Sequence, residues 1–296
     1  MLNTRPWLLG ALTVLTAATT VGCGQTALTN ATTGATKSAS SLAAVSVQGV
    51  TRKLGYNADR FQRVLSRQAK PVHLPRRAKL PATVDNRQWC PPVYDQGQLG
   101  SCTAFAMGKG LREYMQRKNG EKQVQLSALD LYYYERVNMG QEYINQDSGA
   151  NMIDGMTVLE NRGNAVDESW PYKISFFKQQ PPAAADATAA EWKIKKSTNL
   201  ANLDDIKTAI ADGKSVAFGF MVYRNFMRIG GNGIMPMPTG NPIGGHAVLA
   251  VGYDDAKEML IVRNSWGAGF GDKGYFYMPY AFAKDSQQAM EWYTAD

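Results

Sequence analysis

The spacing of apolar side chains changes about two-thirds of the way along the chain. In the earlier part, apolar residues recur three and four positions apart, which is typical of helices. We expect helices there at about 101–119, 127–137, 150–161 and 203–211. From residue 215 onward the apolar residues form short runs bounded by turn residues, which predicts strands. We expect these strands at 215–222, 246–253, 259–263 and 274–278. Helices followed by strands indicate an α+β fold.

Local signals set several boundaries of these elements. Asn119-Gly120 is a plausible end for the first helix, and Ser127 with Asp130 resembles a capping box at the start of the second. The stretch 171–190 is rich in proline and alanine and is expected to be a long loop. The glycine-rich region 230–245 is expected to be a mobile flap beside His246.

The first fifty residues have the composition of an export signal and a tether. Arg5 precedes an apolar run of about a dozen residues, which is too short to span a bilayer as a helix. Thr20-Val21-Gly22-Cys23 resembles a bacterial lipobox, so we expect residues 1–23 to be a signal peptide and Cys23 to be lipidated. Cleavage without lipidation is the alternative. Residues 24–50 are mostly Ser, Thr, Ala and Gly, and we expect a flexible tether there.

Positive charge is concentrated in residues 51–80. Residues 1–80 contain 11 Lys and Arg and one acidic residue, Asp59, which gives a net charge of +10. Residues 81–296 contain 21 Lys and Arg and 24 Asp and Glu, which gives a net charge of −3. The net charge of +7 therefore does not indicate nucleic-acid binding. Two interpretations of 51–80 remain open: a pro-segment that docks on the acidic domain and is cut near Arg76-Arg77, which we prefer, or a juxtamembrane segment on anionic lipid. A short helix capped by Asn57 is expected within it, and His73 is expected to be an exposed bystander.

Residues 81–296 are long enough for one large domain or for two lobes around a cleft. The chain has three cysteines and two histidines, too few for a metal cluster of these ligands, and we expect no metal or cofactor. With Cys23 lipidated, only Cys90 and Cys102 remain. We expect Cys90 to be a packed thiol and no structural disulfide, and we expect a monomer.

Cys102 stands where a glycine-containing loop, Gln96 to Ser101, gives way to a helical pattern. The first amides of a helix have no partners within it and favour negative charge, which lowers the pKa of a thiol placed there. A small buried side chain is the common alternative for a free cysteine. Taken alone, this stretch does not decide between a nucleophile and a packed thiol.

Two later motifs favour the nucleophile. His246 lies at the mouth of an apolar strand, 144 positions (246 minus 102) after Cys102, and Asn264 lies in Asn264-Ser265-Trp266-Gly267. The order cysteine, histidine, asparagine at about this spacing resembles the papain-like cysteine proteases, from about residue 80 to the end of the chain. The loop Tyr94 to Ala104 is similar to that of bacterial members. The resemblance implies two lobes, helical and then β-rich, with Cys102 and His246 facing each other across the cleft.

The resemblance also implies roles for individual residues. Cys102 and His246 would form a thiolate–imidazolium pair, and Asn264 would fix the imidazole tautomer. Trp266 would shield that hydrogen bond from water, and the Gln96 amide would complete the oxyanion hole with the Cys102 backbone N–H. Without the resemblance, each of these residues also has a purely structural interpretation: His246 at a strand end, Gln96 and Asn264 in turns, and Trp266 in the core.

Residues 148–150 resemble a short edge that pairs with an extended substrate backbone. Gly149 and Ala150 would make these contacts, although Ala150 replaces the usual second glycine. Leu99 and Thr103 also depart from the secreted animal and plant members, which carry a cysteine and a tryptophan there.

Together these observations predict an exported cysteine endopeptidase, anchored at the membrane through Cys23 and facing the periplasm or cell surface. Secretion without an anchor is the alternative. The expected partner is a protein or peptide substrate. Acyl transfer or cleavage of cell-wall peptides would use the same pair of residues. An inert binding module with this fold is a third hypothesis, against which the intact set Gln96, Cys102, His246 and Asn264 argues.

Overall fold

The structure of the protein, a computed structural model, describes residues 42–47, 49–57, 70–77 and 79–296. The expected signal peptide with Cys23, most of the expected tether and the short helix after Asn57 lie outside these residues. Among the described residues, no helix has the length and apolar character needed to cross a membrane.

A long helix beginning at the candidate nucleophile runs through the middle of the fold. It consists of α2 (Cys102–Ala106), a π-helical stretch (Met107–Arg112) and α3 (Glu113–Lys118). It ends at Asn119, and Gly120 follows with φ +68°, as its sequence predicts. Further helices of this part are α4 (Ala128–Met139), α5 (Gln141–Ile144), α6 (Met152–Asn161) and α7 (Ala183–Ala189). At the start of α4 the Ser127 side chain accepts a hydrogen bond from Asp130 N, which confirms the expected cap.

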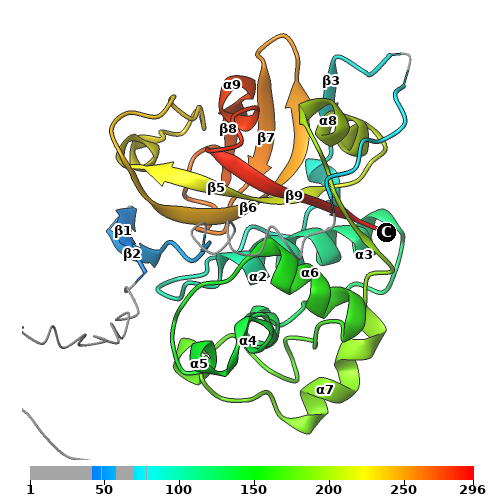
Figure 1. The fold of residues 1–296 in the computed structure, drawn as a ribbon, viewed down its shortest axis with the longest axis vertical. Helices are drawn as coiled ribbons and strands as arrows, with labels where there is room; N and C mark the ends of the chain where they lie inside the picture. The colour runs from blue at the N-terminus through cyan, green and yellow to red at the C-terminus, as the bar shows by residue number, and fades with distance from the viewer. Residues whose placement is uncertain (1–41, 48, 58–69, 78) are drawn as a thin grey trace, which may run out of the picture. The chain divides into compact units, whose positions relative to one another are not determined.

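The second half of the chain forms an antiparallel sheet with neighbours in the order β4-β9-β5-β6-β7-β8, and β3 pairs with β6. Its strands are β3 (Thr83–Asp85), β4 (Ser197–Asn199), β5 (Val216–Tyr223), β6 (Pro242–Asp254), β7 (Met259–Arg263), β8 (Tyr275–Pro279) and β9 (Ala289–Ala295). Two short helices accompany it, α8 (Leu203–Ala211) and α9 (Tyr280–Ala283). Figure 1 shows the strands on one side and α4 to α7 on the other.

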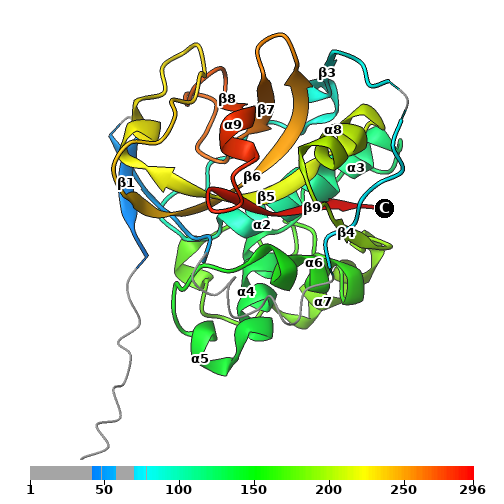
Figure 2. The ribbon, with the colours of Figure 1, turned by 45° about the horizontal axis from the view of Figure 1, so that its top comes forward.

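Strand β6 joins the two lobes because its alternate side chains belong to different apolar cores. Val248 and Ala250 pack into the core of the β-rich lobe. Ala247, Leu249 and Val251 face the opposite way, into a core shared with the helical lobe. In Figure 2 the helix α2 lies between the sheet and helices α4 to α7. The expected α+β fold with two lobes is confirmed.

The residues just before the basic segment are ordered, contrary to the tether expected over 24–50. Strands β1 (Ala44–Val47) and β2 (Val50–Lys53) form a hairpin. Val45 and Val47 are buried in the core of the β-rich lobe. The alternating pattern of this strand is only four residues long, so its composition did not distinguish it from the tether.

Three other expectations need correction. The stretch 171–190 is not one long loop, because α7 occupies Ala183–Ala189, a run of small residues with good helix propensity. Strands β9 and β4 were not predicted, and both lie at one side of the sheet. Residues 242–245 belong to β6, so the glycine-rich region expected as a flap is shorter than 230–245.

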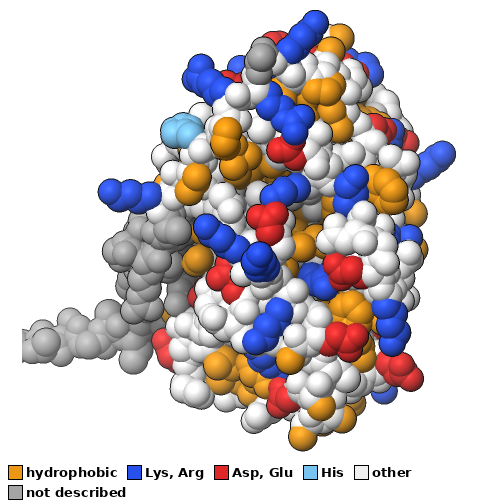
Figure 3. Space-filling view, turned by 90° about the vertical axis from the view of Figure 1, so that its right-hand side faces the viewer, with side chains coloured by type: hydrophobic (Ala, Val, Ile, Leu, Met, Phe, Trp, Pro, Cys, Tyr) orange, Lys and Arg blue, Asp and Glu red, His pale blue; other side chains and the backbone are white. Residues whose placement is uncertain are grey.

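Acidic and basic side chains are interspersed over the face drawn in Figure 3, with no large patch of one sign. This distribution agrees with a domain whose own net charge is small.

Candidate active site

Cys102 is the first residue of α2 and is fully buried. Burial raises the pKa of its thiol to about 12, against the opposing hydrogen bonds from the backbone amides of Ala247, Gly55 and Thr103. The expected lowering of this pKa at the helix start is therefore absent in this arrangement. Because Ala247 directly follows His246, this contact places the strand that carries His246 next to the sulfur.

His246 is held by Asn264 and covered by Trp266. Its Nε2 lies 2.8 Å from Asn264 Oδ1, and its ring stacks on the indole of Trp266 with 4.7 Å between ring centroids. All three side chains are nearly inaccessible to solvent. The structure thus places Asn264 and Trp266 against His246 as the sequence predicts.

The hydrogen bonds around Asn264 determine the imidazole tautomer. The backbone N–H of Ser265 donates to the same Asn264 oxygen, 2.8 Å away, so that atom is an acceptor and His246 Nε2 carries the proton. His246 Nδ1 is then unprotonated, and it has no hydrogen-bond partner among the described residues. Burial lowers the pKa of His246 to about 4, although the bond to Asn264 opposes this. Burial therefore favours the neutral imidazole and the neutral thiol in this arrangement.

Gln96 presents its amide group toward the cleft. Its Nε2 donates to the carbonyl oxygens of Leu99 and Lys53, at 3.0 and 3.2 Å. Its Oε1 accepts a hydrogen bond of 2.7 Å from Ser265 Oγ, which fixes the direction of the amide. Ser265 was not singled out from the sequence. Only its position between Asn264 and Trp266 could have indicated a role in the site. Its hydroxyl bonds to a residue 169 positions away, and such a contact leaves no local sequence pattern.

The protein's own N-terminal chain fills the cleft between the lobes. Tyr56 N donates to Gly245 O on the β-rich side, at 3.0 Å. Asn57 N donates to Ala150 O and Ala150 N donates to Gly55 O on the helical side, at 3.1 and 2.9 Å. The short edge that contains Ala150 thus pairs with an extended backbone, as expected of a substrate-binding edge.

The fit of this segment depends on glycines, because backbone lies against backbone. A Cβ built on Gly55 would lie 1.9 Å from Gly100 O, and one built on Gly149 would lie 2.0 Å from Gly55 O. Neither position has room for a larger residue. Gly100 lies two residues before Cys102, so the segment passes directly over the candidate nucleophile.

Ion pairs flank the covered site. Arg52 pairs with Asp95 at 2.5 Å, and Lys53 pairs with Asp147 at 2.7 Å. Asp147 also accepts hydrogen bonds from Gly100 N and from the Tyr132 hydroxyl. The following stretch of the basic segment docks on acidic groups near α8: His73 on Asp205 and Arg77 on Asp212. His73 is largely exposed there, as expected.

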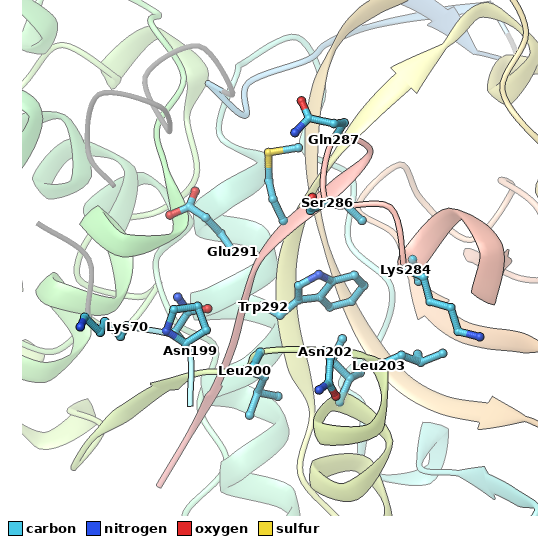
Figure 4. Close-up of a pocket in the computed structure, with 16 residues that line it drawn as sticks. Lys70, Asn199, Leu200, Asn202, Leu203, Lys284, Ser286, Gln287, Glu291 and Trp292 are labelled. Atoms are coloured by element: carbon cyan, nitrogen blue, oxygen red, sulfur yellow. The ribbon is translucent and has the colours of Figure 1, made fainter. Parts of the chain in front are cut away.

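Three further features of the described residues concern metal ligands, a surface pocket and the free cysteines. The described part of the chain has no group of three or more His, Cys, Asp or Glu side chains placed to hold a metal ion. A surface pocket beside β9 is lined by Lys70, Asn199, Lys284 and Trp292 among others, and it includes none of the expected catalytic residues (Figure 4). Cys90 and Cys102 are both free thiols.

Comparison with known proteins identifies the family. Residues 80–294 match the papain family of cysteine proteases. An uncharacterised peptidase C1-like protein of Acanthamoeba polyphaga mimivirus is 34% identical over 67% of this chain and 68% of its own. Bovine cathepsin S is 30% identical over 68% of this chain and 60% of its own length. The chain therefore belongs to the papain family.

Solved structures agree with this assignment. The structure of xylellain, a cysteine protease from Xylella fastidiosa, has a TM-score of 0.70 and 33% identity, and the match covers 76% of this chain and 91% of that one. The Amb a 11 cysteine protease, a ragweed pollen allergen solved in its proform, has a TM-score of 0.65 and 25% identity, with 82% and 74% covered.

Proposed function

We propose that this protein is a cysteine endopeptidase in which Cys102 attacks the peptide carbonyl and His246 acts as base and acid. The observation that carries the proposal is an imidazole whose proton is confined to Nε2 by Asn264, on a strand whose next residue, Ala247, bonds through its backbone to the buried Cys102 thiol. Nδ1 is the nitrogen left to receive the thiol proton. Membership of the papain family supports the same chemistry.

The reaction uses only groups of this site. His246 Nδ1 takes the Cys102 proton, and the sulfur adds to the carbonyl carbon. The Gln96 amide and the Cys102 backbone N–H stabilise the resulting oxyanion. His246 then gives its proton to the leaving amine, and a thioester remains. His246 next removes a proton from water, whose oxygen attacks the thioester, and the acid product leaves as the sulfur is restored.

We further propose that residues 43–47 and 49–57 keep the enzyme inactive until they leave the cleft. Three observations support this zymogen hypothesis: the segment bonds to both lobes, the Gly55 backbone bonds to the buried Cys102 thiol, and the Lys53 carbonyl accepts a hydrogen bond from the Gln96 amide. Burial raises the pKa of the thiol and lowers the pKa of His246 in this covered form. Export and lipidation at Cys23 remain proposals based on the sequence of residues 1–23.

The test is cleavage of an unfolded protein by the full chain after activation, with products read by mass spectrometry. We expect internal cuts by the wild type and none by Cys102→Ala, while Cys90→Ala, the other described thiol, keeps full activity. An epoxide reagent should label Cys102 in the active sample. Unchanged cutting by Cys102→Ala would contradict the proposal. New amide bonds or released cell-wall peptides in place of internal cuts would also contradict it.

A further inference from the structure

Tyr172 joins the two ends of the loop that carries the groups proposed to bind the oxyanion. Its hydroxyl lies 2.8 Å from the backbone oxygen of Gln96 and 2.7 Å from Ser101 Oγ. Gln96 supplies one proposed donor, and Ser101 directly precedes Cys102, whose backbone N–H is the other. One side chain from a distant part of the chain therefore contacts both ends of this loop.

The directions of the two hydrogen bonds follow from the atoms involved. A carbonyl oxygen can only accept, so the Tyr172 O–H donates to Gln96 O, and Ser101 Oγ donates to the Tyr172 oxygen. Burial raises the pKa of the Tyr172 hydroxyl, so the hydroxyl keeps its proton near neutral pH. A directed chain of two hydrogen bonds thus runs from Ser101 through Tyr172 to Gln96.

The Ser101 hydroxyl is used for this contact in place of a more common one. Ser101 is fully buried at the N-cap of α2, where a serine side chain usually accepts a hydrogen bond from a helix amide. Within the described chain its side chain makes no such capping bond and bonds to Tyr172 instead. The contact with Tyr172 therefore replaces a stabilising interaction that this position normally favours.

Packing fixes the position of the Tyr172 ring. The ring lies edge-on to that of Phe105 in α2, with 5.0 Å between centroids and 89° between planes. Two positions later, Ile174 lies against the same loop, since a Cβ built on Gly97 would be 3.2 Å from Ile174 Cδ1. The hydroxyl is therefore held by contacts with both the helix and the loop.

We infer that Tyr172 is a positioning residue for the oxyanion hole. It holds the Gln96 backbone at a fixed distance from the start of α2, so that the Gln96 amide and the Cys102 N–H converge on one oxygen. Two donors stabilise an oxyanion only when both lie about 2.7–3.1 Å from it. Tyr172 acts on the backbone of Gln96, whereas Ser265 directs its side-chain amide. This inference rests on the proposed peptidase function.

Steady-state kinetics of the activated full chain on one peptide tests this role. Tyr172→Phe keeps the packed ring and should lower kcat roughly tenfold with little change in KM, because the oxyanion forms only after binding. Tyr114→Phe is the matched control: it also loses a 2.8 Å bond from a tyrosine to a carbonyl, that of Gly213, and should change neither constant. In a Gln96→Ala background, Tyr172→Phe should lower kcat by less than about twofold, since a single donor has no second donor to be aligned with.

Two measurements at Cys102 do not require peptide cleavage. Alkylation by iodoacetamide displaces iodide and forms no oxyanion, so its rate should be equal in Tyr172→Phe and the wild type. A peptide aldehyde adds to the Cys102 sulfur and places its oxygen in the hole. Its affinity, measured as protection of Cys102 from iodoacetamide, should fall roughly tenfold in Tyr172→Phe.

Three results would overturn the inference. These are unchanged kcat and aldehyde affinity in Tyr172→Phe, the full tenfold loss of kcat in the Gln96→Ala background, or alkylation slowed as much as kcat. A wild type that binds the aldehyde but cleaves no peptide would instead contradict the peptidase function, and the aldehyde affinities would still test Tyr172.

Discussion

Ser265 shows how one hydroxyl group organises the oxyanion site. It donates to Gln96 Oε1, so the Gln96 amide nitrogen, and not its oxygen, faces the cleft. The neighbouring Ser265 backbone N–H fixes the Asn264 amide in the same way. Two adjacent donors on one residue thus orient both side chains that assist the catalytic pair.

We predict that Ser265→Ala lowers kcat by about 2- to 12-fold with little change in KM, because one neutral hydrogen bond contributes roughly 0.5–1.5 kcal/mol. Gln96→Ala should lower kcat far more, since an oxyanion donor is worth about 2.7–4 kcal/mol. Steady-state kinetics on one peptide measures both, with the exposed Ser286→Ala as control. A loss in Ser265→Ala as large as in Gln96→Ala would show that the hydroxyl has a role beyond orienting the amide.

The protonation of His246 in the covered chain gives a second prediction. Since its pKa is lowered to about 4, the ring should stay neutral, with the proton on Nε2, as the pH falls from 7 to 5. Protonation disfavours the buried arrangement, so the stability that neutral His246 contributes is present above its ordinary pKa and is lost as the pH falls toward 4. Nitrogen NMR of the full chain carrying His73→Gln, which removes the other histidine, measures this directly. An imidazolium at pH 6 would contradict the covered arrangement.

Residues 54–57 act as a single unit within the fold. They are extended, they bond to β6 and to the edge at Ala150, and Leu54 packs into the β-rich core. The hairpin of β1 and β2 precedes them directly and anchors them through Val45 and Val47. The covering therefore combines apolar packing with backbone pairing to both lobes.

The close contact at Gly55 predicts that Gly55→Ala dislodges this unit. The added methyl group would overlap Gly100 O, which is backbone and does not move easily. In the full chain we expect Cys102 to be labelled by an epoxide at least tenfold faster than in the wild type. Thr51→Ala, an exposed position in β2, is the matched control and should leave labelling unchanged. Slow labelling of Gly55→Ala would contradict the tight contact at Gly55, and wild-type labelling as fast as that of Gly55→Ala would show that the segment does not cover the site in solution.

Charge is divided unequally along the whole chain, and basic residues of the first part form ion pairs with acidic residues of the domain. Residues 1–80 carry a net charge of +10 and residues 81–296 a net charge of −3. Arg52 and Lys53 meet Asp95 and Asp147 beside the cleft, and Arg77 meets Asp212 farther along. The described parts of the basic segment, 51–57 and 70–77, thus form ion pairs with acidic groups of the domain.

We predict that potassium chloride weakens this docking. Ion pairs at the surface are screened within about 10 Å at 0.1 M salt, and each contributes at most about 1 kcal/mol. Raising the salt from 0.05 to 0.5 M should increase the labelling rate of Cys102 in the full wild-type chain several-fold. The Gly55→Ala chain, already open, should not respond. No response in the wild type would mean that apolar packing and backbone hydrogen bonds hold the segment without a contribution from the ion pairs.

The sequence predicted the parts of the fold that have local signals. Helix α8 and strand β7 lie at the predicted residues because caps, turns and spacing mark their ends. Strand β9 was missed since its pattern is broken by the bulge at Glu291. The motif order brought Cys102, His246, Asn264 and Gln96 into one hypothesis. In the structure Asn264 bonds to His246, Gln96 bonds to Ser265 next to Asn264, and the Cys102 thiol bonds to the backbone of Ala247 next to His246.

What the sequence did not predict arises from contacts between distant residues. Tyr56 meets Glu291 across 235 positions and Ser265 meets Gln96 across 169. Covering of the site by residues 54–57 depends on glycines at 55, 100 and 149, and none of these glycines has a distinctive local sequence.

Comparison of peptide cleavage by the full-length wild type, Gly55→Ala and Gly55→Ala/Cys102→Ala tests both the nucleophile and its covering in one measurement. We expect immediate cleavage by Gly55→Ala, a lag before cleavage by the wild type, and no cleavage by the double variant at any time. Equal initial rates for Gly55→Ala and the wild type would contradict the covering, and cleavage by the double variant would contradict the assignment of Cys102 as the nucleophile.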